Sequence, residues 1–284
     1  MIDLRHVTRR YGDHKAVDDV SFTVDRGQSI ALWGTNGAGK TTLLRCVLGA
    51  TAFEGDIVVD GLSVARDGKA VRQRIGYVPQ VMPTFDLSVA EMVRLIARVR
   101  GADPRDGLSV LESLHLGGTL EQSMRSLSGG MKQKVALALA LLGDAPVLLL
   151  DEPTANLDAH TQADVIAMLG ALREAGRTIV FTSHRWSEVR ALADVVVTLE
   201  HGRAIGMGSV AEMTRIADAV QLRIDLEAES IEPAVSLLRE HGYPTNRHGI
   251  SAVVTVDSRC KAEPLALLAQ SRISVTDFDV EDEP

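Results

Sequence analysis

Residues 34–41 read Gly34-Thr35-Asn36-Gly37-Ala38-Gly39-Lys40-Thr41, which fits the pattern G-x-x-x-x-G-K-[ST]. The apolar run at 28–33 is typical of a buried strand, and the spacing of apolar residues at 40–49 is typical of a helix. Glycines allow backbone N–H groups to point into a loop, and a helix N-terminus attracts anions. The stretch therefore predicts a strand, a phosphate-binding loop and a helix, one after the other.

The residue types in this loop suit a triphosphate. Lys40 is expected to place its charge near the β- and γ-phosphates, and the hydroxyl of Thr41 is expected to ligate Mg²⁺. A chance glycine-rich turn is the alternative, but it does not account for the strand before the loop and the helix after it. We therefore expect the nucleotide to contact Gly34, Thr35, Asn36, Gly37, Ala38, Gly39, Lys40, Thr41 and Thr42.

A second strand is expected to bring carboxylates to the same phosphates. Residues 147–150 read Val-Leu-Leu-Leu, and Asp151 and Glu152 follow directly. Ligand sites lie at the C-terminal ends of parallel strands, so Asp151 would hold Mg²⁺ and Glu152 would polarise the attacking water. Taken alone, the pattern fits a strand that runs into a polar turn equally well. The phosphate-binding loop favours the catalytic interpretation.

Residues 127–133 read Leu-Ser-Gly-Gly-Met-Lys-Gln. Ser128 could be the N-cap of an ordinary helix with two tolerated glycines. The segment nevertheless resembles the LSGGQ signature of the ATP-binding cassette (ABC) ATPases, with Met131 in place of the usual Gln. The chain resembles this family over roughly residues 2–215. The resemblance implies that Ser128, Gly129 and Gly130 contact the phosphates of ATP.

Four further residues match motifs of the ABC ATPases. Tyr11 resembles the aromatic residue that stacks on adenine, although a single Tyr in a loop more often belongs to the plain surface or core. Gln80 resembles the Q-loop glutamine, which touches Mg²⁺ and senses the transport subunit. Asp158, in Asn156-Leu157-Asp158, resembles the D-loop residue that acts across a dimer interface. His184 resembles the switch histidine at the γ-phosphate, whereas a single His is by default structural. The expected catalytic residues are Lys40, Gln80, Glu152 and His184, and the expected metal ligands are Thr41, Gln80 and Asp151.

Strands alternate with helices over most of the chain, which predicts an α/β layered domain. The resemblance implies an ABC-type P-loop NTPase nucleotide-binding domain at 1–216, with a β-subdomain and a helical subdomain. Composition shifts near residue 217, and residues 217–284 resemble a small α+β accessory unit of the ferredoxin-like type. Its expected strands are 220–226, 250–256 and 274–280, and its expected helices are 232–241 and 263–270.

Composition disfavours several other classes of function. The formal net charge of −8 makes the chain a poor general binder of nucleic acid. Cys46 and Cys260 do not make a disulfide framework and favour a reducing cytoplasm. The N-terminus lacks the apolar segment of a secretory signal, and the longest strongly apolar stretch, 135–142, is too short to span a bilayer. We expect other chains to supply any membrane spans.

The resemblance also implies that the site is shared between chains. In ABC ATPases two cassettes face each other head to tail, and ATP lies between the phosphate loop of one and the LSGG segment of the other. This chain has one of each, so we expect a second copy as a partner, with ATP and Mg²⁺ as cofactors. ATP hydrolysis is expected to drive a separate membrane-spanning permease at the cytoplasmic face of the cell membrane. Residues 81–100 resemble cassettes of exporters, and a soluble, non-transport ABC ATPase is the alternative.

Overall fold

The computed structural model describes residues 1–281 apart from 84, 156, 218, 258–259 and 272. The chain forms two compact units, Met1–Val210 and Ala211–Pro284. The division lies at the start of helix α8 (Val210–Ala217), whereas the sequence suggested a boundary after residue 216. Among the described residues, no helix is both long and apolar enough to cross a membrane.

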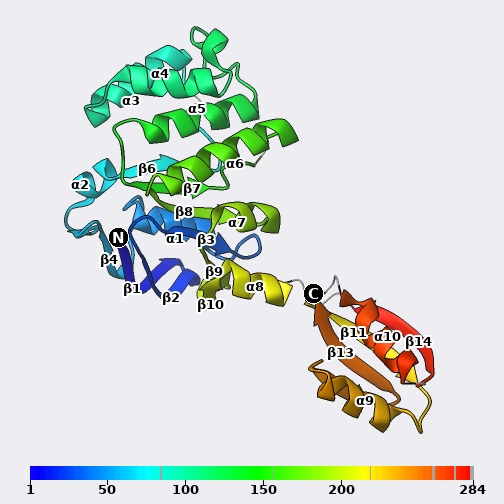
Figure 1. Cartoon of the computed structure of the whole chain (residues 1–284). Helices are drawn as coiled ribbons and strands as arrows, with labels where there is room; N and C mark the ends of the chain where they lie inside the picture. The colour runs from blue at the N-terminus through cyan, green and yellow to red at the C-terminus, as the bar shows by residue number, and fades with distance from the viewer. Residues whose placement is uncertain (84, 156, 218, 258–259, 272, 282–284) are drawn as a thin grey trace. The chain divides into compact units, whose positions relative to one another are not determined.

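Six strands form the central sheet of the first unit (Figure 1), in the order β10 (Arg203–Ser209), β9 (Val195–Glu200), β3 (Ser29–Trp33), β8 (Thr178–Ser183), β7 (Val147–Asp151) and β6 (Ile75–Val78). The strands from β9 to β6 run parallel, and β10 is antiparallel to β9. Every residue of β7 and β8 is buried, as expected for central strands of a parallel sheet. Three helices begin beyond the C-terminal ends of β3, β7 and β8, respectively α1 (Lys40–Val47), α6 (Ala159–Glu174) and α7 (Trp186–Leu192).

A second, antiparallel sheet makes up the β-subdomain. Its strand order is β2 (His14–Val24), β1 (Ile2–Tyr11), β4 (Glu54–Val59) and β5 (Leu62–Ser63). Residues of this sheet, α1 and the central sheet share one hydrophobic core, which includes Leu4, Val20, Leu44 and Leu149. Since β1 ends at Tyr11, this packing fixes where the Tyr11 ring lies relative to the loop after β3. The short helix α2 (Gly68–Gln73) lies between β5 and β6 in the chain.

The helical subdomain has a core of its own. Its elements are α3 (Val89–Arg100), α4 (Pro104–Ser113), the short 3-10 helix η1 (Gly117–Thr119) and α5 (Gly129–Leu141). Figure 1 shows α3, α4 and α5 packed together, with α5 next to β6, and the buried side chains of this group include Val93, Leu111 and Val135. The capping box expected from Ser88 and Glu91 at the start of α3 is confirmed.

The second unit contains β11 (Ala219–Leu226), α9 (Ile231–Glu240), β12 (Thr245–His248), β13 (Ser251–Asp257), α10 (Ala262–Gln270) and β14 (Val275–Glu281). The strands pair antiparallel in the order β12-β13-β11-β14, which is the βαββαβ arrangement of a ferredoxin-like unit. The sequence did not predict β12, because its four residues, Thr-Asn-Arg-His, have no apolar alternation. The second unit has a hydrophobic core of its own, which includes Leu222, Ile224, Leu238 and Val254.

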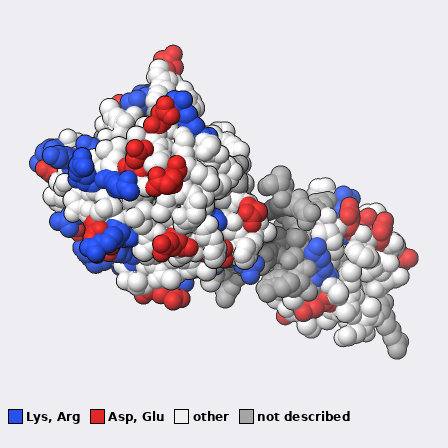
Figure 2. All heavy atoms as spheres, turned by 90° about the horizontal axis from the view of Figure 1, so that it is seen from above, with Lys and Arg blue, Asp and Glu red and all other residues white. Residues whose placement is uncertain are grey.

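Charge on the surface is mixed. Figure 2 shows Lys and Arg side chains gathered along one margin of the larger unit, with groups of Asp and Glu beside them. Among the described residues, surface charges of opposite sign pair: Arg26 lies 2.7 Å from Asp60, and Arg203 lies 2.6 Å from Asp18. On the face that is shown, Asp and Glu lie beside the Lys and Arg of this margin, so the surface there carries both signs of charge.

Candidate nucleotide-binding site

The loop between β3 and α1 requires glycine for two physical reasons. Gly34 and Gly39 have φ angles of 152° and 101°, which side chains of L-residues rarely tolerate. A Cβ at Gly34 would lie 2.2 Å from the carbonyl oxygen of Leu199, and one at Gly39 would lie 2.2 Å from that of Ala16. The loop is therefore pressed between β9 and β2, and it leads directly into the N-terminus of α1, which attracts anions.

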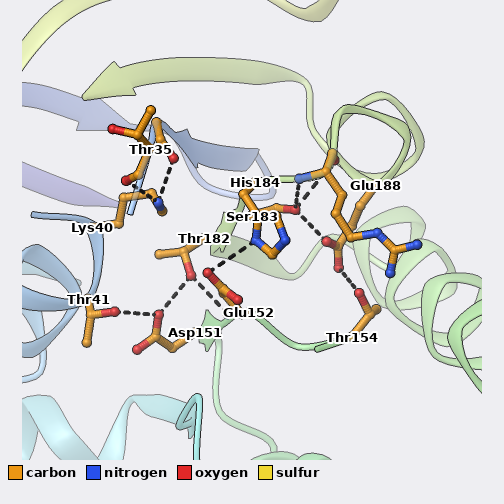
Figure 3. A network of polar contacts seen from close by, with 12 residues as sticks. Thr35, Lys40, Thr41, Asp151, Glu152, Thr154, Thr182, Ser183, His184 and Glu188 are labelled. Atoms are coloured by element: carbon orange, nitrogen blue, oxygen red, sulfur yellow. Dashed lines mark hydrogen bonds and ion pairs between the residues drawn. The ribbon is translucent and has the colours of Figure 1, made fainter. Parts of the chain in front are cut away.

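Lys40 is held inside this loop. Its ammonium donates hydrogen bonds to the carbonyl oxygens of Gly34 (2.6 Å) and Thr35 (2.9 Å), and only 6% of the residue is exposed (Figure 3). The pKa of Lys40 is lowered, mainly by burial, and the nearby Glu152 and Asp151 carboxylates partly oppose this shift. The side chain is thus fixed at the base of the loop, where a positive charge can neutralise phosphate oxygens.

Asp151 lies at the end of β7 with one carboxylate oxygen paired and one free. Its Oδ1 accepts hydrogen bonds from the hydroxyls of Thr41 (2.9 Å) and Thr182 (2.8 Å). Its Oδ2 is buried and has no hydrogen-bond partner among the described residues. The pKa of Asp151 is raised, mainly by burial, and the hydrogen bonds from the Thr182 and Thr41 hydroxyls partly oppose this shift. A buried carboxylate oxygen without a partner, next to a Thr hydroxyl, is the donor set that Mg²⁺ accepts.

Glu152 is aimed by its backbone. It has a φ of 49°, a left-handed conformation that is rare outside glycine and often marks a functional position. Its N–H donates to Oγ1 of Thr182 (2.9 Å), and its Oε1 lies 3.4 Å from Nδ1 of His184. Figure 3 shows Glu152 and His184 facing each other from the ends of β7 and β8. The residues expected to activate water and to contact the γ-phosphate therefore lie side by side.

A pocket of about 400 Å³ brings most of the expected site together. Its lining includes Tyr11, the loop from Asn36 to Thr42, Gln80 and Glu152, with His14 and Ala16 at its wall. A neighbouring pocket of about 300 Å³ is lined by Gly34, Thr35 and His184, among others. Asp151 lies buried beneath and reaches the site through Thr41.

Tyr11 presents its ring at one end of the pocket. It is 46% exposed, and the guanidinium carbon of Arg9 lies 4.4 Å from the centre of its ring. A cation over one face of an aromatic ring holds that ring in place and leaves the opposite face for another planar group. The arrangement suits stacking of a nucleobase on Tyr11.

The LSGG segment and Asp158 are not part of this pocket. Ser128 is the N-cap of α5, where its Oγ accepts from the N–H of Met131 (3.2 Å), and Gly129 is the first helical residue. Asp158 caps α6 by accepting from the N–H and hydroxyl of Thr161, and these bonds lower the pKa of Asp158. Asn156 lies outside the described residues. Within one chain, Ser128, Gly129, Gly130 and Asp158 line neither described pocket of the phosphate loop.

Two residues of the site were missed by sequence reasoning. The Thr182 hydroxyl bonds both the Asp151 carboxylate and the backbone N–H of Glu152. Glu188 accepts hydrogen bonds from Thr154, two residues after Glu152, and from Ser183, directly before His184. A hydroxyl at the end of a strand that neighbours β7 was the available signal for Thr182. Glu188 gave no signal, because an acidic residue in a short helix is usually exposed.

The comparisons with known proteins agree with this geometry. The family described as "ABC transporter" matches residues 17–155. The protein named Nod factor export ATP-binding protein I from Rhizobium etli is 38% identical over 215 residues, which cover 73% of this chain and 67% of that protein. The chain belongs to the ABC transporter family. The ABC ATP-binding protein of the same name from Cupriavidus metallidurans is 31% identical over 275 residues, covering 95% of this chain and 89% of that protein. The homologue from Rhizobium meliloti, 39% identical, is covered over only 64% of its length.

Solved structures of ABC cassettes have the same fold. The ATP-binding subunit of an ABC transporter matches with a TM-score of 0.71 and 27% identity over 76% of this chain and 92% of that one. A dimeric cassette in a post-hydrolysis state, bound to ADP and phosphate, matches with a TM-score of 0.69 and 26% identity over 74% of this chain and 99% of that one. This chain is accordingly an ABC cassette that binds and hydrolyses ATP.

Proposed function

We propose that two copies of this chain close head to tail on two ATP molecules and thereby power export through a separate membrane-spanning permease. The observation that carries the proposal is the separation of two anion receptors. The loop around Lys40 lines the pocket, whereas Ser128 and Gly129 at the N-terminus of α5 are exposed and line neither described pocket of that loop. The second receptor can be used if it meets the nucleotide of another copy.

The residues at the phosphate loop divide the chemistry. Lys40 and the N–H groups of the loop neutralise the phosphates, and the Tyr11 ring stacks on the adenine. Glu152 accepts a proton from the attacking water, and His184 bridges Glu152 and the terminal phosphate. These contacts act mainly by positioning and by stabilising charge in the transition state.

A divalent cation fits the donors present. Thr41 and Gln80 line the pocket and Asp151 lies buried beneath it, and the Thr41 hydroxyl, the Gln80 side chain and Asp151 Oδ2 offer hard oxygen ligands. When bound there, Mg²⁺ would neutralise charge on the β- and γ-phosphates. The chain's own contribution is to orient the Asp151 carboxylate through the hydroxyls of Thr41 and Thr182.

The surface next to Gln80 supports a permease as the partner. A pocket of about 420 Å³ lies there, with Tyr77, Met82, Ile96 and Val99 in its wall. Val81 and Val99 are 76% and 70% exposed, and Phe85 and Leu95 are also exposed. An apolar groove with exposed apolar side chains at its edge marks a protein contact site. Relatives named for Nod factor export suggest the direction, and docking on a permease would place the protein at the cytoplasmic face of the membrane.

Mixing two inactive variants tests the shared site. Lys40→Ala removes the charge of the phosphate loop, and Ser128→Arg blocks the signature helix. Each variant alone should release almost no phosphate from Mg-ATP. In a mixed dimer one of the two sites is intact, so the equimolar mixture should recover roughly a quarter of wild-type turnover, for random pairing and independent sites.

The control for this experiment is the double variant, Lys40→Ala with Ser128→Arg in one chain, mixed with wild type at the same total concentration. In a mixed dimer of this control, one site lacks Lys40 and the other lacks Ser128. Both sites should be inactive, so only wild-type pairs should release phosphate. The control mixture should therefore also show roughly a quarter of wild-type turnover, all of it from wild-type pairs, whereas sites that act within one chain would give roughly half. Roughly a quarter of wild-type turnover in both mixtures supports the head-to-tail site. If the first mixture stays inactive while wild type is active, the two receptors do not act in trans.

A further inference from the structure

A carboxylate that the proposed chemistry does not use is buried beside the site. Glu188 lies on α7 and is only 3% exposed, and its neighbours Thr154 and Ser183 are 2% and 1% exposed. Buried carboxylates are rare unless they are fully hydrogen-bonded, because burial disfavours the charged form. The position therefore calls for a physical explanation.

Both oxygens of Glu188 are satisfied by hydroxyl donors. The Thr154 hydroxyl donates to Oε1 at 2.8 Å, and the Ser183 hydroxyl donates to Oε2 at 2.5 Å (Figure 3). Ser183 Oγ in turn accepts from the N–H of Arg185 at 3.0 Å. The carbonyl of Thr154 accepts from Gln162 Nε2 of α6 at 3.3 Å. One carboxylate thus connects the turn after β7 with the turn after β8.

These two turns carry the residues that must meet at the γ-phosphate. Thr154 lies in the turn that begins with Glu152, and Ser183 directly precedes His184. The parallel ladder between β7 and β8 ends at Asp151 and Thr182, so backbone pairing does not hold the strands together beyond that point. The contact between Glu152 Oε1 and His184 Nδ1, at 3.4 Å, depends on other bonds between the turns.

We propose that Glu188 is a positioning residue, which clamps the two turns through Thr154 and Ser183 and so sets the separation of Glu152 and His184. The inference rests on the proposed function for the roles of those two residues. An apolar side chain at this position would leave two buried hydroxyls without their acceptor, and the turns would relax apart. A glutamine has the same shape and can bond one hydroxyl through its oxygen and the other through its nitrogen.

The test compares Glu188→Ala and Glu188→Gln with Glu174→Gln, an exposed carboxylate at the end of α6. Phosphate release at saturating Mg-ATP and binding of a fluorescent ATP analogue are measured on the purified full chain. Glu188→Ala should lower kcat about 10- to 100-fold and leave the Kd within about twofold, because displacements near 1 Å in catalytic groups have effects of this size. Glu188→Gln should regain most of kcat, and Glu174→Gln should match wild type. Equal losses in the Ala and Gln variants, or no loss in Ala, would overturn the proposal.

A second readout separates positioning from folding and from a failure of the proposed function. The side-chain NMR signals of His184, assigned by their absence in His184→Ala, should shift in Glu188→Ala and in Thr154→Val but return toward wild type in Glu188→Gln. Adding Thr154→Val to Glu188→Ala should change little, since Glu188→Ala already breaks the bond to Thr154. Unchanged His184 signals in Glu188→Ala would contradict the clamp. If wild type and Glu152→Gln hydrolyse ATP equally well, the assigned chemistry fails, while the His184 signals still decide the role of Glu188.

Discussion

Thr182 Oγ1 lies 2.8 Å from Oδ1 of Asp151, and the same hydroxyl oxygen accepts the N–H of Glu152 at 2.9 Å. A single hydroxyl on β8 therefore orients two consecutive residues at the end of β7. Because one residue is expected to hold the metal and the next to activate water, this bond makes the two roles geometrically dependent on each other.

Replacing this hydroxyl should be costly. Thr182→Val keeps the shape but removes one donor from a buried carboxylate and the acceptor of the Glu152 N–H, which should lower the free energy of unfolding by about 1–3 kcal/mol. Urea denaturation without nucleotide measures this, and phosphate release should fall in parallel. Thr198→Val on β9 is the matched control, because the Thr198 hydroxyl is buried and no described residue is its hydrogen-bond partner. A loss in Thr198→Val as large as that in Thr182→Val would contradict the assignment.

The left-handed backbone at Glu152 predicts a trade between stability and activity. Glu152→Gly should abolish hydrolysis but raise the free energy of unfolding by up to about 1 kcal/mol relative to Glu152→Gln, since glycine adopts φ 49° without strain. Glu152→Gln is the reference because it also removes the charge and keeps the strain. Thermal or urea denaturation of the two inactive variants is the measurement, and a less stable glycine variant would show that the backbone there is unstrained.

The sequence predicted those parts of the site that are local in the chain. Residues 34–41 and the run before Asp151 carry their own signals, because glycine placement and an apolar strand followed by carboxylates each imply a geometry. The structure places Tyr11, Gln80 and Glu152 around one pocket with Lys40, and their roles toward a nucleotide stay predictions.

The remaining features depend on the register between distant strands. Thr182 matters only because β7 and β8 pair with Asp151 opposite Thr182. Glu188 matters only because α7, which follows β8, brings its carboxylate within hydrogen-bond distance of Thr154 and Ser183, and α7 itself is too short for its periodicity to be recognised. Similarly, the sequence of Ser128-Gly129-Gly130 does not indicate how far this segment lies from Lys40 of the same chain, because that distance depends on the fold.

The ionisation of Glu188 should make stability depend on pH. Burial raises its pKa, although the bonds from Ser183 and Thr154 lower it, so the folded chain holds this proton to a higher pH than the unfolded chain does. Protonated Glu188 stabilises the fold fully below the pKa of this residue in the unfolded chain, about 4.3. This contribution is lost as the pH rises through the pKa of Glu188 in the folded chain. Glu188→Gln does not titrate, so its stability relative to wild type should increase with pH and then level off. Urea denaturation of both proteins from pH 5 to 8, in EDTA, is the measurement, and a relative stability that falls with pH would contradict the raised pKa.

Nucleotide affinity should depend on the ring of Tyr11 and on the cation behind it. Tyr11→Ala should weaken ATP binding by about 1–3 kcal/mol, the range for a base stacked on an aromatic side chain, whereas Tyr11→Phe should bind nearly as well as wild type. Arg9→Ala should have a smaller effect in the same direction, because the guanidinium 4.4 Å from the ring centre restricts the ring and does not touch the base. Inorganic triphosphate, which has no base, should compete with ATP with unchanged affinity in all of these variants. If triphosphate binding weakens as much as ATP binding does in Tyr11→Ala, the substitution has disturbed the phosphate loop, and the ring does not hold the adenine.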